Sequence, residues 1–452
     1  MKKSILVLVA LLIAFAPVYA QEVNKEAKKA EVKSHLKQHF KPYGFIRNYF
    51  TYDSRECIAG TGDLYNYQPK DQNLNAYGDD LNATSTFRFL SLTTRVGLNI
   101  VDYKWRNTEF SGKIEADFYA GLSTKTNQTH SVSGTAQFRL RQAYVTLGWD
   151  SLRMNDKDFA RVDLTIGQAW HPMAADLCDV IALASGAPFG PFNRSPQVKM
   201  DARLGKYVTL TAAGLWQMQY LSTGPEGQSA EYLLYSKTPE AYLGLSFHDK
   251  GFLMRVGADV LSIQPRHLGT DAAGETIKVN DRITTASPFI YLQYKKGEFS
   301  IKAKSIFAEA GEHMNLNSGY GISKINPDGS YEYTPLRNSS SWISIVYGGK
   351  VGAQEDKHPQ KLQGILFAGY IHNFGTKDTL VGSLYTPRPN TMREMWRLTP
   401  TLLYTVGKFQ VGLEYEITSV QYGKGLDKHG LAQNDLHWVT NHRVQLMTKY
   451  NF

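Results

Sequence analysis

Residues 437–452, HWVTNHRVQLMTKYNF, end the chain in a strict alternation between two kinds of side chain. One face carries Val444, Leu446, Thr448, Tyr450 and Phe452, and the other carries Arg443, Gln445, Met447, Lys449 and Asn451. A repeat of two residues is the period of a β-strand, whose successive side chains point to opposite faces. The stretch therefore predicts a long C-terminal strand with one apolar face and one polar face.

The same alternation recurs through most of the chain, as in 110–120, 197–204 and 409–418. It predicts sixteen strands, near 44–53, 85–101, 108–122, 135–149, 160–171, 196–204, 206–221, 239–248, 251–264, 283–295, 297–310, 340–349, 361–374, 391–405, 408–422 and 437–452. Pro288 and Pro400 fall inside two of these strands, although proline cannot donate a ladder hydrogen bond.

The gaps between the predicted strands alternate in length. Gaps after even-numbered strands are mostly tight, as at Gly205, whereas gaps after odd-numbered strands are long, as in 54–84 and 311–339. Short turns at one rim and long loops at the other are typical of an all-β, antiparallel transmembrane barrel. We predict sixteen strands, short periplasmic turns, long extracellular loops and both termini at the periplasmic rim. The terminal Phe452, with apolar residues at every second position before it, also resembles the assembly signal of outer-membrane barrels.

Composition agrees with this prediction. The chain has 452 residues, of which 12% are aromatic and 20% charged, and it holds no apolar run of 18 residues. A helical membrane span needs about 20 consecutive apolar residues, so helical spans are excluded. The lipid face of a barrel uses only every second residue, so a mean hydropathy of −0.35 is compatible with it.

The N-terminal residues are predicted to form a secretory targeting signal followed by a polar tether. Residues 1–20 combine two lysines, an apolar core and a small-x-Ala cleavage site, which is the pattern of a secretory signal peptide. An uncleaved anchor helix is the alternative. Residues 21–43 form a short periplasmic segment, rich in lysine and alanine up to residue 42, and residues 44–452 form the barrel. We expect the outer membrane of a Gram-negative bacterium as its location.

The polar faces of the strands should line a lumen, and basic residues exceed acidic ones there. The basic positions are Arg47, Arg95, Lys113, Arg139, Arg141, Arg161, Lys199, Arg203, Arg255, Lys302, Lys304, Arg393, Arg397, Arg443 and Lys449. The acidic positions are Asp53, Glu115, Asp117, Asp163, Asp201, Asp259, Glu414 and Glu416. A positively charged aqueous channel concentrates anions and repels cations, so we predict a porin for small hydrophilic solutes that prefers anions.

Seven of these basic residues are the predicted anion-binding wall: Arg139, Arg141, Arg161, Lys199, Arg203, Arg393 and Arg397. The first five lie on consecutive strands and should form one patch. In the alternative interpretation, each pairs with a neighbouring carboxylate and only stiffens the wall.

Residues 172–195, PMAADLCDVIALASGAPFGPFNRS, are unusually apolar for a surface loop. We therefore expect this loop to fold inward and narrow the pore, with Asp176 and Asp179 facing the basic patch. The alternative is an outward loop that covers a neighbouring subunit. Cys57 and Cys178 both fall in predicted extracellular loops, where a disulfide is permitted, and two unpaired thiols are the alternative.

Two short segments around this loop resemble a known family. Residues 166–173, IGQAWHPM, and residues 193–200, NRSPQVKM, look like the region around strand five, loop three and strand six of the DcaP-like outer-membrane porins. Residues 41–47, KPYGFIR, resemble the first strand of those porins. The resemblance implies a homotrimer that favours small anionic solutes such as dicarboxylates, while the extended N-terminal coiled coil of the family is reduced here to 21–42.

The sequence contains none of the catalytic or metal-binding motifs that mark common enzymes, such as G-x-S-x-G, His-Glu-x-x-His or a P-loop. We predict no enzymatic activity, no catalytic residue, no metal, no cofactor and no nucleic-acid partner. Two other classes stay open. One is an outer-membrane hydrolase that uses the barrel as a scaffold, and the other is an adhesin-like barrel that binds through its long loops.

Overall fold

A computed structural model describes residues 38–60, 65–91, 93–119, 137–154, 157–181, 186–351, 358–389 and 391–452. The predicted signal peptide, residues 21–37 and the loop 120–136 lie outside these ranges. In the described part of the chain, no helix has the length and apolar character needed to cross a membrane.

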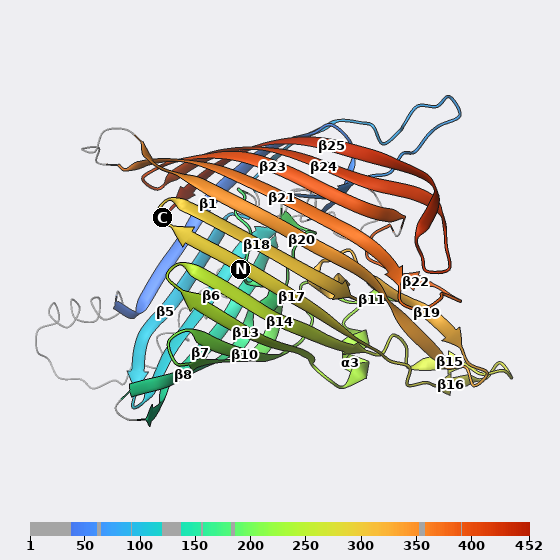
Figure 1. Cartoon of the computed structure of the whole chain (residues 1–452), viewed down its shortest axis with the longest axis horizontal. Coiled ribbons are helices and arrows are strands. Elements are labelled where there is room, and N and C mark those ends of the chain that lie inside the picture. Colours follow the sequence, from blue (N-terminus) through green and yellow to red (C-terminus); the bar gives the residue numbers. More distant parts are fainter. Residues whose placement is uncertain are drawn as a thin grey trace, which may run out of the picture.

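The described residues form a closed antiparallel barrel of sixteen strands, as predicted (Figure 1). Its spans are β1 (Phe40–Asp53), β4–β5 (Thr86–Leu90, Arg95–Trp105), β6 (Thr108–Tyr119), β7 (Gln137–Met154), β8 (Lys157–Trp170), β9 (Arg194–Leu204), β10 (Val208–Leu215), β13 (Glu240–Asp249), β14 (Phe252–Ile263), β17 (Ile283–Lys296), β18 (Phe299–Glu309), β20 (Tyr331–Val351), β21 (Gln360–Thr376), β23 (Met392–Val406), β24 (Phe409–Leu426) and β25 (Ala432–Asn451). β4 and β5 count as one interrupted span because both pair with β1, at its two halves.

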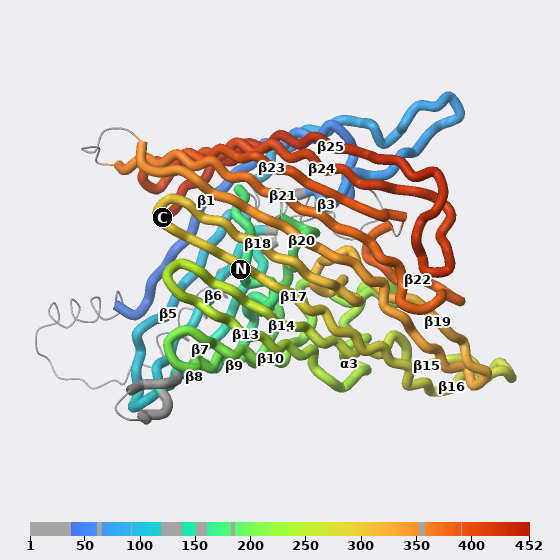
Figure 2. Tube along the Cα trace, in the orientation of Figure 1, coloured from blue at the N-terminus to red at the C-terminus, as the bar shows by residue number. Residues whose placement is uncertain are grey.

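Short elements lie in the long connections between these strands. They are the strands β2 (Cys57–Gly60), β3 (Tyr65–Pro69), β11 (Thr223–Gly224), β12 (Gly227–Gln228), β15 (Leu268–Thr270), β16 (Thr276–Lys278), β19 (Gly319–Ile325) and β22 (Leu384–Tyr385), the helix α3 (Glu231–Ser236) and the 3-10 helices η1 (Pro172–Ala174) and η3 (Glu312–Met314). Figure 2 shows the tight turns at one end of the barrel and the long connections at the other. The C-terminus lies at the short-turn end, together with the start of β1 (Figure 1).

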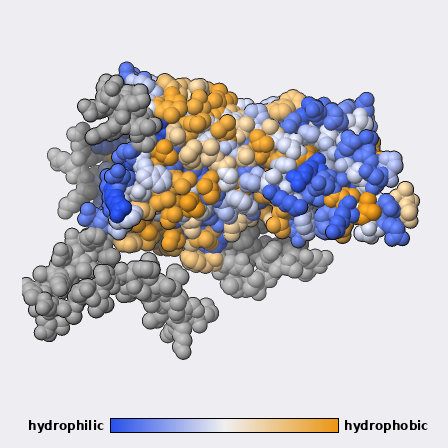
Figure 3. Space-filling model, turned by 90° about the horizontal axis from the view of Figure 1, so that it is seen from below, coloured by the Kyte–Doolittle hydropathy of each residue, from blue (hydrophilic) through white to orange (hydrophobic). Residues whose placement is uncertain are grey.

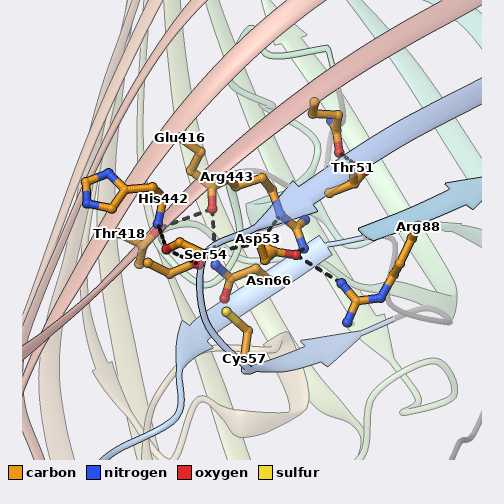
Figure 4. A network of polar contacts seen from close by, with 12 residues as sticks. Thr51, Asp53, Ser54, Cys57, Asn66, Arg88, Glu416, Thr418, His442 and Arg443 are labelled. Carbon is orange, nitrogen blue, oxygen red and sulfur yellow. Dashed lines mark hydrogen bonds and ion pairs between the residues drawn. The ribbon is translucent and has the colours of Figure 1, made fainter. Parts of the chain in front are cut away.

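The seam between β1 and β25 closes the barrel, running from Phe45 opposite Asn451 to Asp53 opposite Arg443. At its outer end, Arg443 donates two hydrogen bonds of 2.8 Å to Asp53, and Arg88 donates a third at 3.0 Å (Figure 4). At its inner end, the N–H of Phe452 donates to the carbonyl of Gly44. A Cβ at position 44 would stand 2.5 Å from the Phe452 ring, so only glycine fits there.

The alternation predicted from the sequence fits the observed orientation of the side chains. On β25, Arg443 and Gln445 are 2% and 1% exposed, whereas Val444 and Leu446 are 42% and 37% exposed. The outward faces form an apolar band with hydrophilic residues on either side (Figure 3). Trp396 and Tyr404 lie on this outward face, as predicted for an aromatic girdle.

Both prolines are accommodated within their strands. Pro288 lies on the outward face of β17, opposite Ala258. Pro400 also points outward and pairs with Leu366 of β21, while the pairing of β23 with β24 skips Thr399 and Pro400. The β17–β14 pairing continues through Pro288, and the missing N–H of Pro400 interrupts the β23–β24 ladder locally without ending the strand.

Candidate functional site: the pore constriction

The described part of the loop 172–195 contacts inward-facing side chains of the barrel wall. It leaves β8 at η1 and reaches the inner wall on the far side of the lumen. Near its middle, the N–H of Ile181 donates to Glu414 of β24 at 3.1 Å, and the Tyr49 hydroxyl of β1 donates to the Ile181 carbonyl at 3.3 Å. Residues 182–185 lie outside the described residues. The loop therefore occupies part of the lumen and narrows it.

The two motifs that carry the family resemblance brace the ends of this loop. Trp170, the last residue of β8, is the register partner of Arg194, the first residue of β9. The Arg194 guanidinium lies over the Trp170 ring at 4.9 Å. Gln197 donates hydrogen bonds to the carbonyls of Ala169 and Trp170 at 3.2 and 3.0 Å. These residues hold the start and the end of the loop side by side.

Aromatic packing fixes the second half of the loop. Phe189 is fully buried and lies edge-to-face on Phe367 of β21. A Cβ at Gly369 would come within 2.5 Å of the Phe189 ring, so the glycine makes the room for it. The Ser340 hydroxyl of β20 donates to the Phe189 carbonyl at 2.8 Å. This half of the loop is thus packed against the wall like a protein core.

Basic residues of the wall behind the loop hold its first half. Lys304 of β18 donates to the carbonyls of Met173 and Asp176 at 2.7 and 3.1 Å. Lys302, two residues earlier on the same strand, donates to the Asp179 carboxylate at 2.8 Å. Asp176 in turn lies 3.3 Å from Arg255 of β14. The predicted constriction acids are therefore each paired with a cation outside the predicted basic patch.

The prediction that Arg397 belongs to the anion-binding wall is wrong, because this side chain is not accessible from the pore. Its guanidinium is 1% exposed and donates to the carbonyls of Ala187 at 2.9 Å and Asn66 at 2.8 Å. It also lies 3.4 Å from Glu416 of β24. The residue points inward as predicted, but two loops cover it, so it anchors them and does not line the open pore. Arg393, nearer the outer rim, is half-buried and donates to the Ala432 carbonyl at 2.9 Å.

The first five predicted patch residues lie on the opposite wall and fall into two clusters. In the first cluster, Arg139 and Arg141 share Asp117, with distances of 3.0 and 2.6 Å. Arg141 also donates to Glu115 at 2.9 Å and is almost fully buried. These ion pairs match the alternative interpretation, in which neighbouring carboxylates engage the cations and stiffen the wall.

The second cluster contains the other three predicted residues. Arg161 and Arg203 are register partners on β8 and β9, and both approach Asp163, at 2.9 and 3.8 Å. Lys199 pairs with Asp201 at 2.6 Å. All three cations keep a solvent-exposed part, which reaches 57% for the Arg203 side chain. The expected single patch is therefore divided into two clusters of ion pairs, and Arg141 is the one of the five cations that is buried.

Two members of the second cluster, Lys199 and Arg203, line a polar cavity of about 760 Å³ near the short-turn end of the lumen. Its charged lining residues are Lys199, Arg203, Lys206, Lys250 and Arg255 on the basic side and Asp163, Asp201 and Asp249 on the acidic side. The cavity thus has five basic groups against three acidic ones, besides His248.

Arg194 was missed in the count of lumen charges. Period-two alternation assigns position 194 to the outward face, yet its side chain is buried between Trp170 and Phe192. In the described part of the chain it forms no ion pair with a carboxylate, and its Nη1 has no hydrogen-bond partner. Only the motif resemblance pointed to this residue.

Both cysteines are free thiols, so the possible disulfide is not formed. Cys178 is buried in the apolar cluster behind the constriction loop, together with Phe189 and Trp342. Cys57 lies on β2 of the first long loop and donates to the Arg55 carbonyl. Each thiol therefore has its own surroundings, which agrees with the alternative of two unpaired cysteines.

The fold is similar to that of known outer-membrane channels. Over 91% of this chain and 97% of the other, it matches the crystal structure of the outer-membrane channel DcaP of Acinetobacter baumannii with a TM-score of 0.60 and 17% identity. Salmonella typhi OmpF, solved in complex with daunomycin, matches at 0.48 and 11% over 91% and 97% of the two chains. An anion-selective porin from Comamonas acidovorans matches at 0.46 and 10% over 91% and 99%.

No protein-family model and no curated protein sequence matches the chain. The similarity to DcaP is therefore a similarity of structure. At the level of the fold, it confirms both the resemblance and the outer-membrane porin architecture that the sequence predicts.

Proposed function

We propose that this protein is a porin through which small hydrophilic solutes diffuse across the outer membrane, with a preference for anions such as small carboxylates. The observation that carries the proposal is the excess of basic groups in the cavity that contains Lys199 and Arg203. An aqueous passage with walls of low dielectric focuses the field of such groups, so anions are concentrated and cations are repelled.

The location of the excess matters more than the total charge. At physiological salt, an exposed charge is screened beyond about 8 Å, so charges on the outer loops contribute little to selectivity. The guanidinium of Arg203 presents several donors in one plane, which suits the two oxygens of a carboxylate better than an ammonium group does. Arg203 and Lys199 are therefore the residues to which we assign anion preference.

The test is the reversal potential of single channels in a salt gradient. We expect the wild type to prefer chloride over potassium. The double variant Lys199→Gln, Arg203→Gln leaves three basic and three acidic groups in the cavity, and its anion preference should fall several-fold. The control is Lys324→Gln, because Lys324 of β19 pairs with Glu332 of β20 and both side chains are exposed. Cation preference in the wild type, or equal effects of the two variants, would contradict the proposal.

We also propose a homotrimer, which the resemblance to the DcaP-like porins implies. From the N-terminal residue pattern we propose a cleaved signal peptide over residues 1–20 and a short periplasmic segment over 21–43. The mass of the detergent-solubilised protein, measured by analytical ultracentrifugation, should correspond to three chains. N-terminal sequencing of the mature protein should begin at Gln21. A monomeric complex or an N-terminus at Met1 would contradict the respective proposal.

A further inference from the structure

Four titratable side chains meet inside the protein at the base of the constriction loop. They are His171 before η1, Glu240 of β13, Asp259 of β14 and His313 of η3, and all four are at most 1% exposed. Within the described residues, His171, Glu240 and Asp259 form the one group of potential ligands whose atoms all lie within 4.8 Å of one another. Porin function as proposed above uses none of these residues.

The hydrogen bonds of the cluster are incomplete. Oε2 of Glu240, Oδ1 of Asp259 and Nε2 of His313 are buried and make no hydrogen bond in the structure. Unmet buried polar atoms are costly, and three of them within one cluster call for an additional partner. Two carboxylates at this point also create a strongly negative field.

The backbone distinguishes the roles of the two imidazoles. The N–H of Met173 donates to Nδ1 of His171 at 3.1 Å, so this nitrogen carries no proton and the ring proton is on Nε2. That Nε2–H points at Oε1 of Glu240, 2.6 Å away. His171 is thus a hydrogen-bond donor that positions Glu240, and its Nε2 has no free lone pair.

His313 has the opposite arrangement. Its Nδ1 donates to the carbonyl of Ala310 at 3.2 Å, so Nε2 is the nitrogen that faces the two carboxylates, and it can bind a metal ion once it releases its proton. Nε2 lies 3.5 Å from Oε1 of Glu240 and 3.4 Å from Oδ2 of Asp259. Ligand atoms about 2.0–2.1 Å from a tetrahedral zinc ion stand roughly 3.4 Å apart. A histidine whose second nitrogen donates to a backbone carbonyl is also the usual arrangement of a metal ligand.

We propose that Nε2 of His313 and one carboxylate oxygen each of Glu240 and Asp259 bind a divalent cation of the zinc class, with His171 as a positioning residue for Glu240. Nitrogen and oxygen ligands together favour a transition-metal ion of this class over calcium or magnesium, which prefer oxygen alone. The ion would join the loop of η3 to β13 and β14, next to the start of the constriction loop.

The test uses the full-length protein, purified in detergent, freed of metal with a chelator and titrated with Co²⁺ and then Zn²⁺. We expect one ion per chain by elemental analysis after gel filtration, and the visible absorption of four-coordinate Co²⁺, which Zn²⁺ should abolish. Folding is checked by the heat-dependent mobility of the barrel on gels. If folded wild-type protein retains no stoichiometric metal and shows no such absorption, the proposal is overturned.

The variants separate the roles of the residues. His313→Gln and Asp259→Asn should lose the ion, whereas His171→Gln should keep the stoichiometry and lose about 10–100-fold in affinity. The matched control is His372→Gln, because His372 forms a partly exposed pair with Glu394 at 3.2 Å elsewhere in the barrel. Loss of the ion from His372→Gln, or its complete loss from His171→Gln with retention in His313→Gln, would overturn the assignment. If a ligand variant does not fold, the wild-type titration still decides.

Discussion

The two walls of the lumen use similar residues for different purposes. On the wall formed by β18 to β24, Lys302, Lys304 and Arg397 point inward but are occupied by the constriction loop. On the wall formed by β8 and β9, Lys199 and Arg203 point inward and remain accessible in the polar cavity. The comparison teaches that an inward cation contributes to ion selectivity only where no segment of the chain covers it.

The largest effect is expected from breaking the covered wall at Arg397. Arg397→Met removes the bonds to two loops and the guanidinium that lies 3.4 Å from the buried carboxylate of Glu416. Breaking a buried ion pair from one side costs about 3–5 kcal/mol. The free energy of unfolding in detergent, measured with denaturant, should fall by this amount. Arg393→Met, on the same strand but half-buried with a single bond to a carbonyl, should cost about 1 kcal/mol. Equal costs would show that Arg397 is no anchor.

The next largest effects are expected from replacing Lys304 and Lys199, which should change stability and ion selectivity in opposite ways. Lys304→Met removes the donor of two loop carbonyls, so we expect a loss of about 1–3 kcal/mol in unfolding free energy and little change in reversal potential. Lys199→Met, on the open wall, should show the reverse pattern. Both variants are measured by denaturant unfolding and in planar bilayers. If Lys304→Met shifts selectivity as much as Lys199→Met does, the distinction between the walls is wrong.

The orientation of the open wall can be probed with single cysteines. In a background with Cys57→Ser and Cys178→Ser, Lys199→Cys should react with an anionic thiol reagent through the pore, whereas Val198→Cys should not, because its side chain faces lipid. Mass spectrometry of the labelled protein measures the extent. The opposite result would place β9 in the other register, since a slip of one residue exchanges the two faces.

The smallest effect is expected from the native cysteines. Thiol titration of the unfolded, unreduced protein should find two free groups, and the double serine variant should lose less than the roughly 2–4 kcal/mol that a disulfide contributes. If no free thiol is found and the double serine variant loses about 2–4 kcal/mol of unfolding free energy, Cys57 and Cys178 form a disulfide between the first long loop and the constriction loop.

The strands could be predicted from the sequence because each depends on local alternation. A lipid-facing position must be apolar whatever its neighbours are. A few adjacent residues therefore suffice to predict that Val444 faces outward and Arg443 faces inward. The inward loop was predicted for the same reason, since its apolar composition does not suit a loop in water.

Whether each charged side chain of the lumen is covered by a loop or accessible to solutes could not be predicted in this way. Arg397 contacts Ala187 and Asn66, which are 210 and 331 residues away in the sequence, so its burial depends on where two loops cross the lumen. The cluster of His171 and His313 was missed for a related reason. Its members come from two strands and two loops and show no common spacing, so only the closed barrel brings them together.

The seam at Gly44 and Phe452 has a consequence for the order of events during assembly. β1 is among the first strands to be synthesised and β25 is the last, yet each is the other's hydrogen-bonded neighbour. Until the final residue is available, β1 presents an unpaired edge that is prone to pairing with other chains. Closure of the barrel therefore depends on the pairing of two strands that lie far apart in the sequence, and we expect it to be a late step of assembly.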